Sequence, residues 1–257
     1  MASGKNDNQA KRILSRGELL QLARWNTPTI YNGLEAITSN DRLALIFNRE
    51  ETRDFMGEMG AMVGYAMTVV IEPGNHRHKE ESPGAWRSYR EYVGQGDYPK
   101  IIVVQDLDGD CSVGSFWGEV NASIHKALGC VGTITDGAIR DVDEMSIIGF
   151  KAIAKRLCVG HAYSHPVRWN CSVHVFGVEI TPGDLIHADK HGFLVVPPRD
   201  ASNLLDAARF MDANECETLI AATKAAAGKS LDEFLNDLDA ASTKFKQNRD
   251  SHFSGIP

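Results

Sequence analysis

The sequence predicts an α/β domain with a mixed β-sheet core and flanking helices, and three features of the chain support this expectation. Apolar runs bounded by turn residues alternate with helical patterns through the middle of the chain. A run of strands then follows, and the part after about residue 200 has a helical pattern. Alternating strands and helices favour parallel pairing, and successive strands favour antiparallel pairing, so both kinds are expected in one sheet.

The N-terminal third of the chain contains a helical region and a buried strand. Residues 1–14 are polar and are expected to form a tail. Apolar residues recur at helical spacing over 15–34, and Thr27-Pro28 interrupts that run. The apolar, β-rich stretch 60–71 ends before Pro73-Gly74, which predicts a buried strand.

The middle of the chain begins with a polar insertion, 74–98, in which 84–93 is compatible with a short helix. A strand is expected at 101–106, and a turn feeding a helix at 114–130. Residues 131–141 are expected to form a strand followed by a tight turn at Asp136-Gly137.

The C-terminal half starts with further strands at 149–155 and 171–180. The stretch 181–197 is expected to be a hairpin that turns near Lys190-His191-Gly192. The length suits one large domain, or one domain of ordinary size with extended ends, and a C-terminal tail is expected over 236–257.

Composition excludes several classes of function. The net charge of the 257 residues is −7 and no block of Lys and Arg occurs, which argues against a nucleic-acid-binding surface. No apolar run approaches the roughly 18 residues of a membrane helix, and the N-terminus lacks an apolar signal core. No CxxC pair occurs, so reduced thiols in a cytoplasmic protein are expected. The cysteines are Cys111, Cys130, Cys158, Cys171 and Cys216.

The candidate catalytic residues are Glu119, Arg140 and Asp141, which follow a Gly-rich turn and a strand. Ends of elements are where α/β scaffolds place their sites. One carboxylate can hold a hard divalent cation such as Mg²⁺ or Mn²⁺, and a second can orient its waters. An arginine binds a carboxylate or stabilises a developing enolate. The alternative interpretation is an exposed Arg–Asp ion pair beside a turn.

The stretch from Trp117 to Asp141 resembles the family that contains 4-hydroxy-4-methyl-2-oxoglutarate aldolase and the regulator of ribonuclease activity A (RraA). The segments WGE, LGCVGTI and DGAIRD carry the resemblance, and 20 residues separate Glu119 from Arg140-Asp141, as in the family. GYAMTV at 64–69, the PGD run within 177–197 and the helix at 213–231 also match. The resemblance covers about 15–235.

The resemblance implies roles for individual residues. Asp141 would be the direct metal ligand, and Arg140 would bind substrate and stabilise the enolate. The backbone of residues 118–121 (Gly118, Glu119, Val120 and Asn121) would bind the pyruvate carboxylate, and Glu119 would also hold a water of the metal. A glutamate from a neighbouring subunit, Glu217 or else Glu215, would complete the site. The implied assembly is a homotrimer or homohexamer, and the implied fold is a swivelling β/β/α domain.

The function that the resemblance implies is a metal-dependent lyase that cleaves a 4-hydroxy-2-oxo acid to pyruvate and a second carbonyl compound, or decarboxylates oxaloacetate. Two alternatives remain open: a non-enzymatic inhibitor of a ribonuclease, and a methyltransferase. No Gly-rich nucleotide-binding loop supports the methyltransferase. Segment 74–98 and the histidines His161 and His165 depart from the family pattern.

Other histidine pairs are compatible with metal binding but are better explained as solvated or hydrogen-bonding side chains. They are His76 with His78 and His187 with His191. The aspartates at 106, 108 and 110 begin like a calcium loop, but Cys111 and Trp117 stand where that loop needs Gly and Glu. No GxSxG motif occurs, which disfavours a serine hydrolase.

Overall fold

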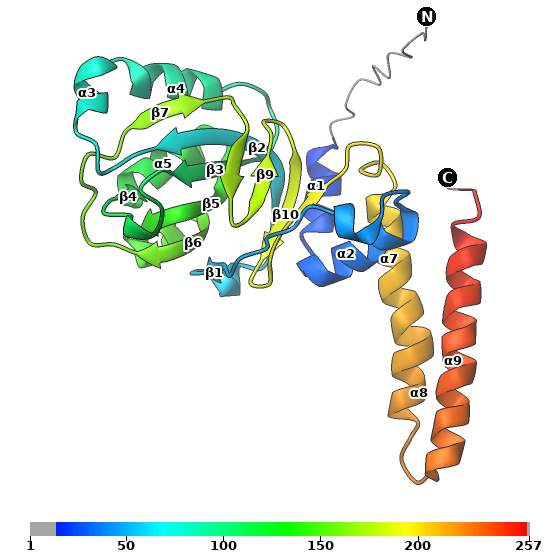
Figure 1. Cartoon of the computed structure of the whole chain (residues 1–257). Coiled ribbons are helices and arrows are strands. Elements are labelled where there is room, and N and C mark those ends of the chain that lie inside the picture. The colour runs from blue at the N-terminus through cyan, green and yellow to red at the C-terminus, as the bar shows by residue number, and fades with distance from the viewer. Residues whose placement is uncertain (1–13, 256–257) are drawn as a thin grey trace, which may run out of the picture.

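The computed structural model describes residues 14–255, and a nine-stranded mixed sheet forms its centre (Figure 1). Neighbouring strands follow the order β1-β6-β5-β3-β2-β10-β11, with β4 paired to β5 and β7 paired to β2. The strands of this sheet are β1 (Arg53–Asp54), β2 (Met62–Ile71), β3 (Lys100–Asp106), β4 (Ser115–Trp117), β5 (Cys130–Ile139), β6 (Lys151–Leu157), β7 (Pro166–Trp169), β10 (Leu185–Asp189) and β11 (Gly192–Val196). A separate hairpin consists of β8 (Val173–Val175) and β9 (Val178–Ile180).

The pairing confirms the predicted mixed sheet with flanking helices. Strands β2, β3, β5 and β6 are parallel neighbours, whereas β1, β7, β10 and β11 join by antiparallel pairing. The helices are α1 (Arg16–Leu22), α2 (Thr27–Ile37), α3 (Arg77–Glu81), α4 (Ala85–Val93), α5 (Glu119–Ala127), α6 (Val142–Ile147), α7 (Leu204–Glu215), α8 (Ala221–Lys224) and α9 (Leu231–His252). A π-helical turn, η4 (Cys216–Ile220), joins α7 to α8.

Both faces of the sheet are buried. Along β2, Met67, Val69 and Ile71 join the apolar cluster under α4, α5 and α6, whereas Ala66 and Val70 join the cluster under the β8–β9 hairpin. Successive side chains of a strand point to opposite faces, so a strand covered on both sides reads as one continuous apolar run. That is the pattern by which 60–71 was predicted, and the structure confirms it as β2.

Other predicted elements are also confirmed. The strand expected at 101–106 is β3, and the short helix expected at 84–93 is α4. The hairpin expected at 181–197 is formed by β10 and β11. The helical region 15–34 is two helices, because Asn26 caps α2 with its side chain and Pro28 lies in the first turn.

The predicted turn at Asp136-Gly137 is wrong, since both residues lie inside β5. Strand β5 pairs with β6 through Ala138 and Ile139, with a register irregularity after Thr135. The glycine serves a close approach: a Cβ at Gly137 would lie 2.7 Å from Oδ2 of Asp106 on the neighbouring β3. Asp-Gly is a common turn signal, but here tertiary packing decides the conformation.

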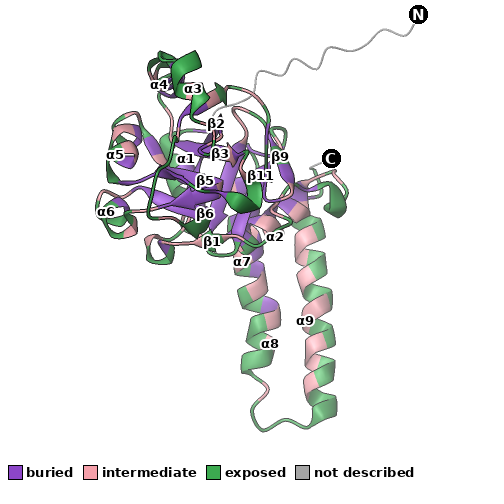
Figure 2. Cartoon of the chain, turned by 60° about the vertical axis from the view of Figure 1, so that its left-hand side comes forward, coloured by how far each residue is buried: buried purple, intermediate pink, exposed green. Residues whose placement is uncertain are grey.

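The expected C-terminal tail at 236–257 is helical through His252, and the expected boundary at 235 falls inside α9. Ser230 and Glu233 form a capping box that starts this helix. Helix α9 runs back along α7, η4 and α8, and the helical hairpin extends away from the sheet (Figures 1 and 2). Asn214 of α7 is buried and donates to the backbone oxygen of Phe245 at 3.0 Å. The expected N-terminal tail, 1–14, lies outside the described residues except for Leu14, which is buried.

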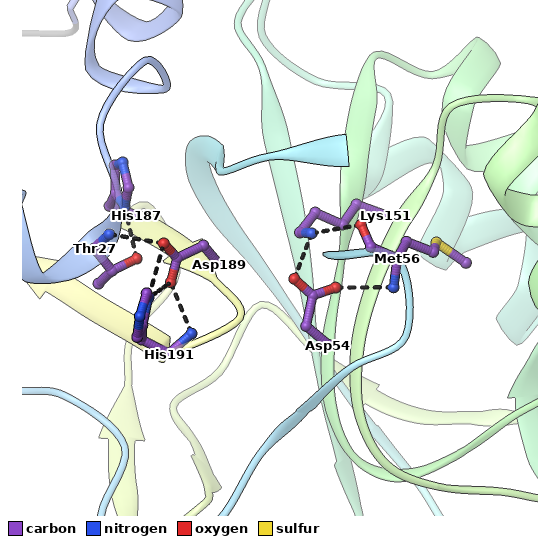
Figure 3. A network of polar contacts seen from close by, with 7 residues as sticks. All are labelled: Thr27, Asp54, Met56, Lys151, His187, Asp189 and His191. Carbon is purple, nitrogen blue, oxygen red and sulfur yellow. Dashed lines mark hydrogen bonds and ion pairs between the residues drawn. The ribbon is translucent and has the colours of Figure 1, made fainter. Parts of the chain in front are cut away.

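Two polar networks fasten segments to the sheet (Figure 3). Asp189 accepts hydrogen bonds from the backbone N–H groups of Thr27 and His191, both at 2.9 Å. The Thr27 hydroxyl and Nδ1 of His187 are 2.9 Å apart, and burial lowers the pKa of His187 to about 4. Asp189 and His187 therefore hold the start of α2 to the β10–β11 hairpin, whereas His191 bonds Asp189 within the hairpin.

The second network is a buried ion pair between Lys151 of β6 and Asp54 of β1, with Nζ to Oδ2 at 2.6 Å. Asp54 also accepts from the Met56 N–H at 2.9 Å, and Lys151 donates to the Met56 carbonyl at 3.0 Å. The two buried charges thus pair with each other, and each also bonds to the backbone of Met56, as buried charges require.

Candidate active site

The predicted site residues come from two loops at one edge of the sheet. Gly118 and Glu119 connect β4 to α5, and Arg140 and Asp141 connect β5 to α6. Because β4 and β5 are parallel neighbours, with Trp117 opposite Ile139, the two loops leave the sheet at the same edge. Residues that are 22 positions apart in the chain are thereby brought into contact.

Two hydrogen bonds join the two loops, and an ion pair lies within the β5–α6 loop. The Glu119 backbone N–H donates to Oδ2 of Asp141 at 3.0 Å, and the Arg140 N–H donates to the Trp117 carbonyl at 3.1 Å. Nε of Arg140 lies 3.7 Å from the same Asp141 oxygen. The side chains of Arg140 and Asp141 are each 39% exposed, so the pair is open to solvent on one side.

The backbone of Asp141 is left-handed, with φ 54° and ψ 46°. Aspartate is among the few non-glycine residues that visit this region, at some cost in free energy. Such strain is concentrated at functional sites, because the surrounding structure must enforce it. The conformation lets the residue precede α6 while its carboxylate accepts from the Glu119 N–H across the loop.

Gly118 provides the space that the Arg140–Asp141 pair needs. A Cβ at this position would lie 2.6 Å from Oδ2 of Asp141 and 3.1 Å from Nε of Arg140. The backbone itself is extended, with φ −165°, so any residue could adopt it. The requirement for glycine here is steric.

A cavity of about 230 Å³ opens beside this pair. It is walled by residues of α4, of the β4–α5 junction, of the β5–α6 loop and of the loop after β6. These are Trp86, Arg90, Ser115, Phe116, Trp117, Gly118, Val120, Asn121, Ile124, Arg140, Asp141, His161 and Ser164. A second hollow, of about 360 Å³, lies on the other side of Arg140 and Asp141 and is lined by α6 and the end of β6.

Unpaired polar atoms are concentrated at the first cavity. Within residues 14–255, five buried side-chain N or O atoms have no hydrogen-bond partner, and four belong to residues that line it. These four are Nε of Arg90, Nε1 of Trp117, Oδ1 of Asn121 and Oγ of Ser164. Buried polar groups in native proteins are nearly always paired, so this concentration indicates a site for a polar ligand.

The wall behind the cavity is rigid. His125 of α5 is buried, and its Nδ1 lies 2.7 Å from the Asn121 carbonyl, to which it donates. Its Nε2 therefore accepts from the Tyr89 hydroxyl at 2.9 Å, and burial lowers the pKa of His125 to about 4. The Trp117 ring packs edge-on against this imidazole, with 4.8 Å between centroids. A neutral histidine thus fixes the tryptophan whose indole N–H is unpaired.

Sequence reasoning identified Gly118, Asn121, Arg140 and Asp141, which all line the cavity. Glu119 is exposed, and it contacts these residues through its backbone N–H, which donates to Asp141. Val120, which also lines the cavity, is 74% exposed.

The remaining lining residues were missed, including Trp86, Arg90, Trp117 and Ser164. For Trp86 and Arg90 the only signal in the sequence was the polar, aromatic-rich character of 74–98. His161 lines the cavity, whereas His165 is buried, with Nε2 3.0 Å from the Ser82 carbonyl. Glu215 ends α7 and Glu217 lies in η4, and neither lines the cavity of its own chain.

The donors available to a metal are few. Over the described part of the chain, no group of three or more His, Cys, Asp or Glu side chains could hold a metal ion together. Asp141 offers one carboxylate, and Gly118 leaves room beside it. A single hard oxygen ligand with space for water is a donor set that Mg²⁺ accepts, because this ion usually keeps several waters.

No helix in the described residues combines the length and the apolar character that crossing a membrane requires. All five cysteines are free thiols.

Comparison with known proteins gives related sequences over most of the chain. "Putative 4-hydroxy-4-methyl-2-oxoglutarate aldolase" of Halalkalibacterium halodurans is 27% identical over 182 residues, which cover 68% of this chain and 79% of that protein. Protein DlpA of Legionella pneumophila is 28% identical over 140 residues. That match covers 53% of this chain but only 21% of DlpA.

The fold has a counterpart among solved structures. The crystal structure of Streptomyces coelicolor RraAS2, described as an unusual member of the RNase ES inhibitor RraA protein family, superposes with a TM-score of 0.60 at 24% identity. The superposition covers 80% of this chain and 96% of RraAS2. At this identity the likeness concerns the fold alone.

The sequence model of the RraA-like family, described as Aldolase/RraA, matches residues 35–195. This range is more than half of the 257 residues and contains the β4–α5 and β5–α6 loops that meet at the cavity. The chain therefore belongs to the RraA-like family.

Proposed function

We propose that this chain is a divalent-metal-dependent lyase of the class II aldolase type, which cleaves a 4-hydroxy-2-oxo acid to pyruvate and a second carbonyl compound. Oxaloacetate decarboxylation, which also passes through a pyruvate enolate, is proposed as a second reaction of the same site. The observation that carries the proposal is the meeting of Gly118, Arg140 and Asp141 at a cavity where four buried polar atoms lack partners.

The substrate carboxylate has a binding place at the start of α5. The first N–H groups of a helix have no intrahelical partner and attract anions. The Glu119 N–H is already donated to Asp141, so the N–H groups of Val120 and Asn121 remain for a substrate carboxylate. Of the expected loop 118–121, the Glu119 N–H is therefore left out of the proposed contact with the substrate carboxylate.

Asp141 is proposed to hold Mg²⁺ or Mn²⁺, which would act as a Lewis acid on the 2-oxo group. Arg140 lies beside Asp141 and is proposed to stabilise the negative charge that develops on the 2-oxo oxygen. Its guanidinium is oriented by a bond from Nη1 to the Val159 carbonyl at 3.3 Å and by the Asp141 carboxylate.

Glu119 is exposed and lies between Gly118 and Val120, which line the cavity, and its carboxylate is proposed to work through water. It accepts the proton of the 4-hydroxyl group as the C3–C4 bond breaks and a carbonyl forms at C4. The bonding electrons remain on C3 as the enolate. The same proton is then returned to C3, which yields pyruvate and leaves the enzyme unchanged.

The proposal extends to the assembly. A homotrimer or homohexamer in the cytoplasm would let Glu217 or Glu215, from the helical hairpin of a neighbouring subunit, reach the cavity. Both residues lie at the π-helical turn η4, and π-helical turns are frequent at functional sites. Sedimentation velocity with activity measured across the profile tests this, because an active monomer would contradict it.

A pyruvate-release assay tests the reaction. The panel contains 4-hydroxy-2-oxo acids and oxaloacetate, each with chelator, with restored Mg²⁺, and with an Asp141→Asn protein purified in parallel. We expect release that chelation abolishes and Mg²⁺ restores, and none above background from the variant. Absence of release from every substrate would refute the lyase and would leave inhibition of a ribonuclease as the function to test.

A further inference from the structure

One wall of the cavity comes from α4, within the inserted segment 74–98. Trp86 and Arg90 lie four residues apart on this helix and share one face, and both line the cavity. Arg140 lines the same cavity of about 230 Å³. Two arginines from distant parts of the chain therefore border one small volume.

Aromatic packing holds Arg90 in place. Its guanidinium carbon lies 4.9 Å from the centroid of the Trp86 ring, and that ring stacks on Phe116 at 5.4 Å with an interplanar angle of 9°. His165 packs edge-on against Trp86, with 6.1 Å between centroids. A guanidinium on a fixed ring is oriented before any ligand arrives, which reduces the entropy lost on binding.

Arg90 has no acidic neighbour that would neutralise it in the part of the chain that the structure describes. Across residues 14–255, no carboxylate forms an ion pair with it, and its Nε is buried without a hydrogen-bond partner. Ser164, across the cavity, has a buried hydroxyl that also lacks a partner. Arg87 on the same helix shows the contrast: its Nε binds Glu91 at 2.8 Å, and the arginine side chain is 85% exposed.

A buried donor of a cationic group that lacks a partner is costly, and a native fold retains it where a ligand supplies the acceptor. The planar fork of arginine matches a carboxylate. Arg140 and the start of α5 already account for the 2-oxo acid end under the proposed function. The acceptor for Arg90 therefore belongs to the other end of the substrate.

We propose that Arg90, with Ser164, forms a second carboxylate-binding subsite that selects 4-hydroxy-2-oxo acids carrying a carboxylate beyond C4. This inference rests on the proposed function for the orientation of the substrate. It assigns the inserted segment 74–98 a role in specificity, through the α4 face that presents Trp86 and Arg90.

Two substrates that differ in one group test the subsite. In 4-hydroxy-2-oxoglutarate a carboxylate follows C4, and in 4-hydroxy-2-oxopentanoate a methyl group takes its place. We expect Arg90→Gln to lower kcat/KM for the dicarboxylate about 10- to 100-fold, mainly through KM, and to change that for the monocarboxylate less than twofold. Arg90→Lys should lose less kcat/KM than Arg90→Gln, because lysine keeps the positive charge but lacks the planar fork of the guanidinium.

Arg87→Gln is the matched control, since it removes an arginine of the same helix that does not line the cavity. It should leave both substrates unaffected. An equal loss on both substrates with Arg90→Gln would show a structural role, and no loss on either would show no role. Both outcomes overturn the subsite.

Binding of unreactive analogues separates this inference from the proposed function. The analogues 2-hydroxyglutarate and 2-hydroxypentanoate differ in the same C5 carboxylate, and calorimetry in Mg²⁺ compares their affinities. We expect the parent protein to prefer 2-hydroxyglutarate and Arg90→Gln to lose that preference, even if no 2-oxo acid is turned over. In that case the lyase fails and the carboxylate subsite stands. A parent protein that binds both analogues equally, or neither, overturns the subsite.

Discussion

The backbone N–H of Glu119 donates a 3.0 Å hydrogen bond to Oδ2 of Asp141. This bond crosses between the β4–α5 and β5–α6 loops, and it orients the carboxylate by a main-chain group that no side-chain substitution removes. The other Asp141 oxygen faces no donor recorded among the described residues, and the side chain is 39% exposed. The Asp141 side chain therefore links the two loops, so changes at Asp141 or at its neighbours Gly118 and Arg140 should alter the site.

Substitutions in the Arg140–Asp141 pair should separate catalysis from folding. Arg140→Lys keeps the charge but loses the planar fork, so we expect kcat to fall roughly 100- to 1,000-fold while the protein stays folded and still binds metal. Asp141→Asn should lose metal binding as well. Steady-state kinetics and Mn²⁺ titration measure both effects. The exposed pair Lys155–Asp110 supplies the control, Asp110→Asn, and near-normal kinetics for both site variants would refute the assignment.

Gly118→Ala should impair the site by steric contact alone. The added Cβ would stand 2.6 Å from Oδ2 of Asp141, so the carboxylate must move away from the Glu119 N–H. We expect at least a tenfold loss of kcat/KM with Tm changed by only a few degrees, because the displaced groups are side-chain ends that are partly exposed. Gly57→Ala is the control, since nothing lies within 4 Å of its Cβ position. Equal activity of the two variants would contradict the steric argument.

Asp136 should make stability depend on pH. Burial, with a further contribution from the charge of Asp106, raises the pKa of Asp136 to about 7. An unfolded aspartate titrates near 4, so between about pH 4 and 7 the folded state holds a proton that the unfolded state has released. Stability is therefore lost as the pH rises through this window, and the loss is complete above the folded pKa.

Asp136→Asn removes that titration and keeps an oxygen to accept from the Asp106 N–H, which bonds Oδ1 at 2.8 Å. The free energy of unfolding of the variant, relative to that of the parent, should therefore be higher at pH 8 than at pH 5 by a few kcal/mol. Urea unfolding at the two pH values measures the difference. The exposed Asp239→Asn serves as control, and a parent-minus-variant difference that is the same at both pH values would exclude the effect.

Lys151 and Asp54 should depend on one another for stability. Their side chains are 2% and 3% exposed, and Nζ lies 2.6 Å from Oδ2. Lys151→Met leaves a buried carboxylate without its partner, so we expect a loss of about 3–5 kcal/mol in the free energy of unfolding. Lys155→Met, on the same strand, breaks an exposed pair and should cost about 0–1 kcal/mol.

The double variant Lys151→Met with Asp54→Leu completes the test by urea unfolding. Because both charges are gone, it should recover a large part of the loss. A double variant that is less stable than Lys151→Met alone would show that packing, and not the unpaired charge, determines the effect.

Patterns of local origin were enough to predict much of the molecule. The apolar run of β2, the helix α4 and the hairpin β10–β11 followed from periodicity and turn residues, which act over a few positions. The family resemblance indicated Glu119 and Arg140-Asp141, and the loops that carry them meet because β5, the strand between them, returns the chain to the same edge of the sheet. Their catalytic roles stay predictions. The predicted turn at Asp136-Gly137 was wrong because the glycine is needed for a long-range contact. It leaves room for Asp106 of the neighbouring strand β3.

The sequence by itself determined the alternation of elements and the mixed sheet, since these depend on side-chain type and on spacing along the chain. Its resemblance to a family indicated Gly118, Arg140 and Asp141 as candidate site residues. Only the tertiary structure placed Arg90 and Ser164, 74 positions apart, at that same cavity with their buried polar atoms unpaired. Only the tertiary structure likewise shows that residues 236–252 are part of helix α9, which packs along α7. A polar side chain or an amphipathic segment can pair with many partners, and long-range packing determines which one it contacts. A local sequence pattern does not contain that information.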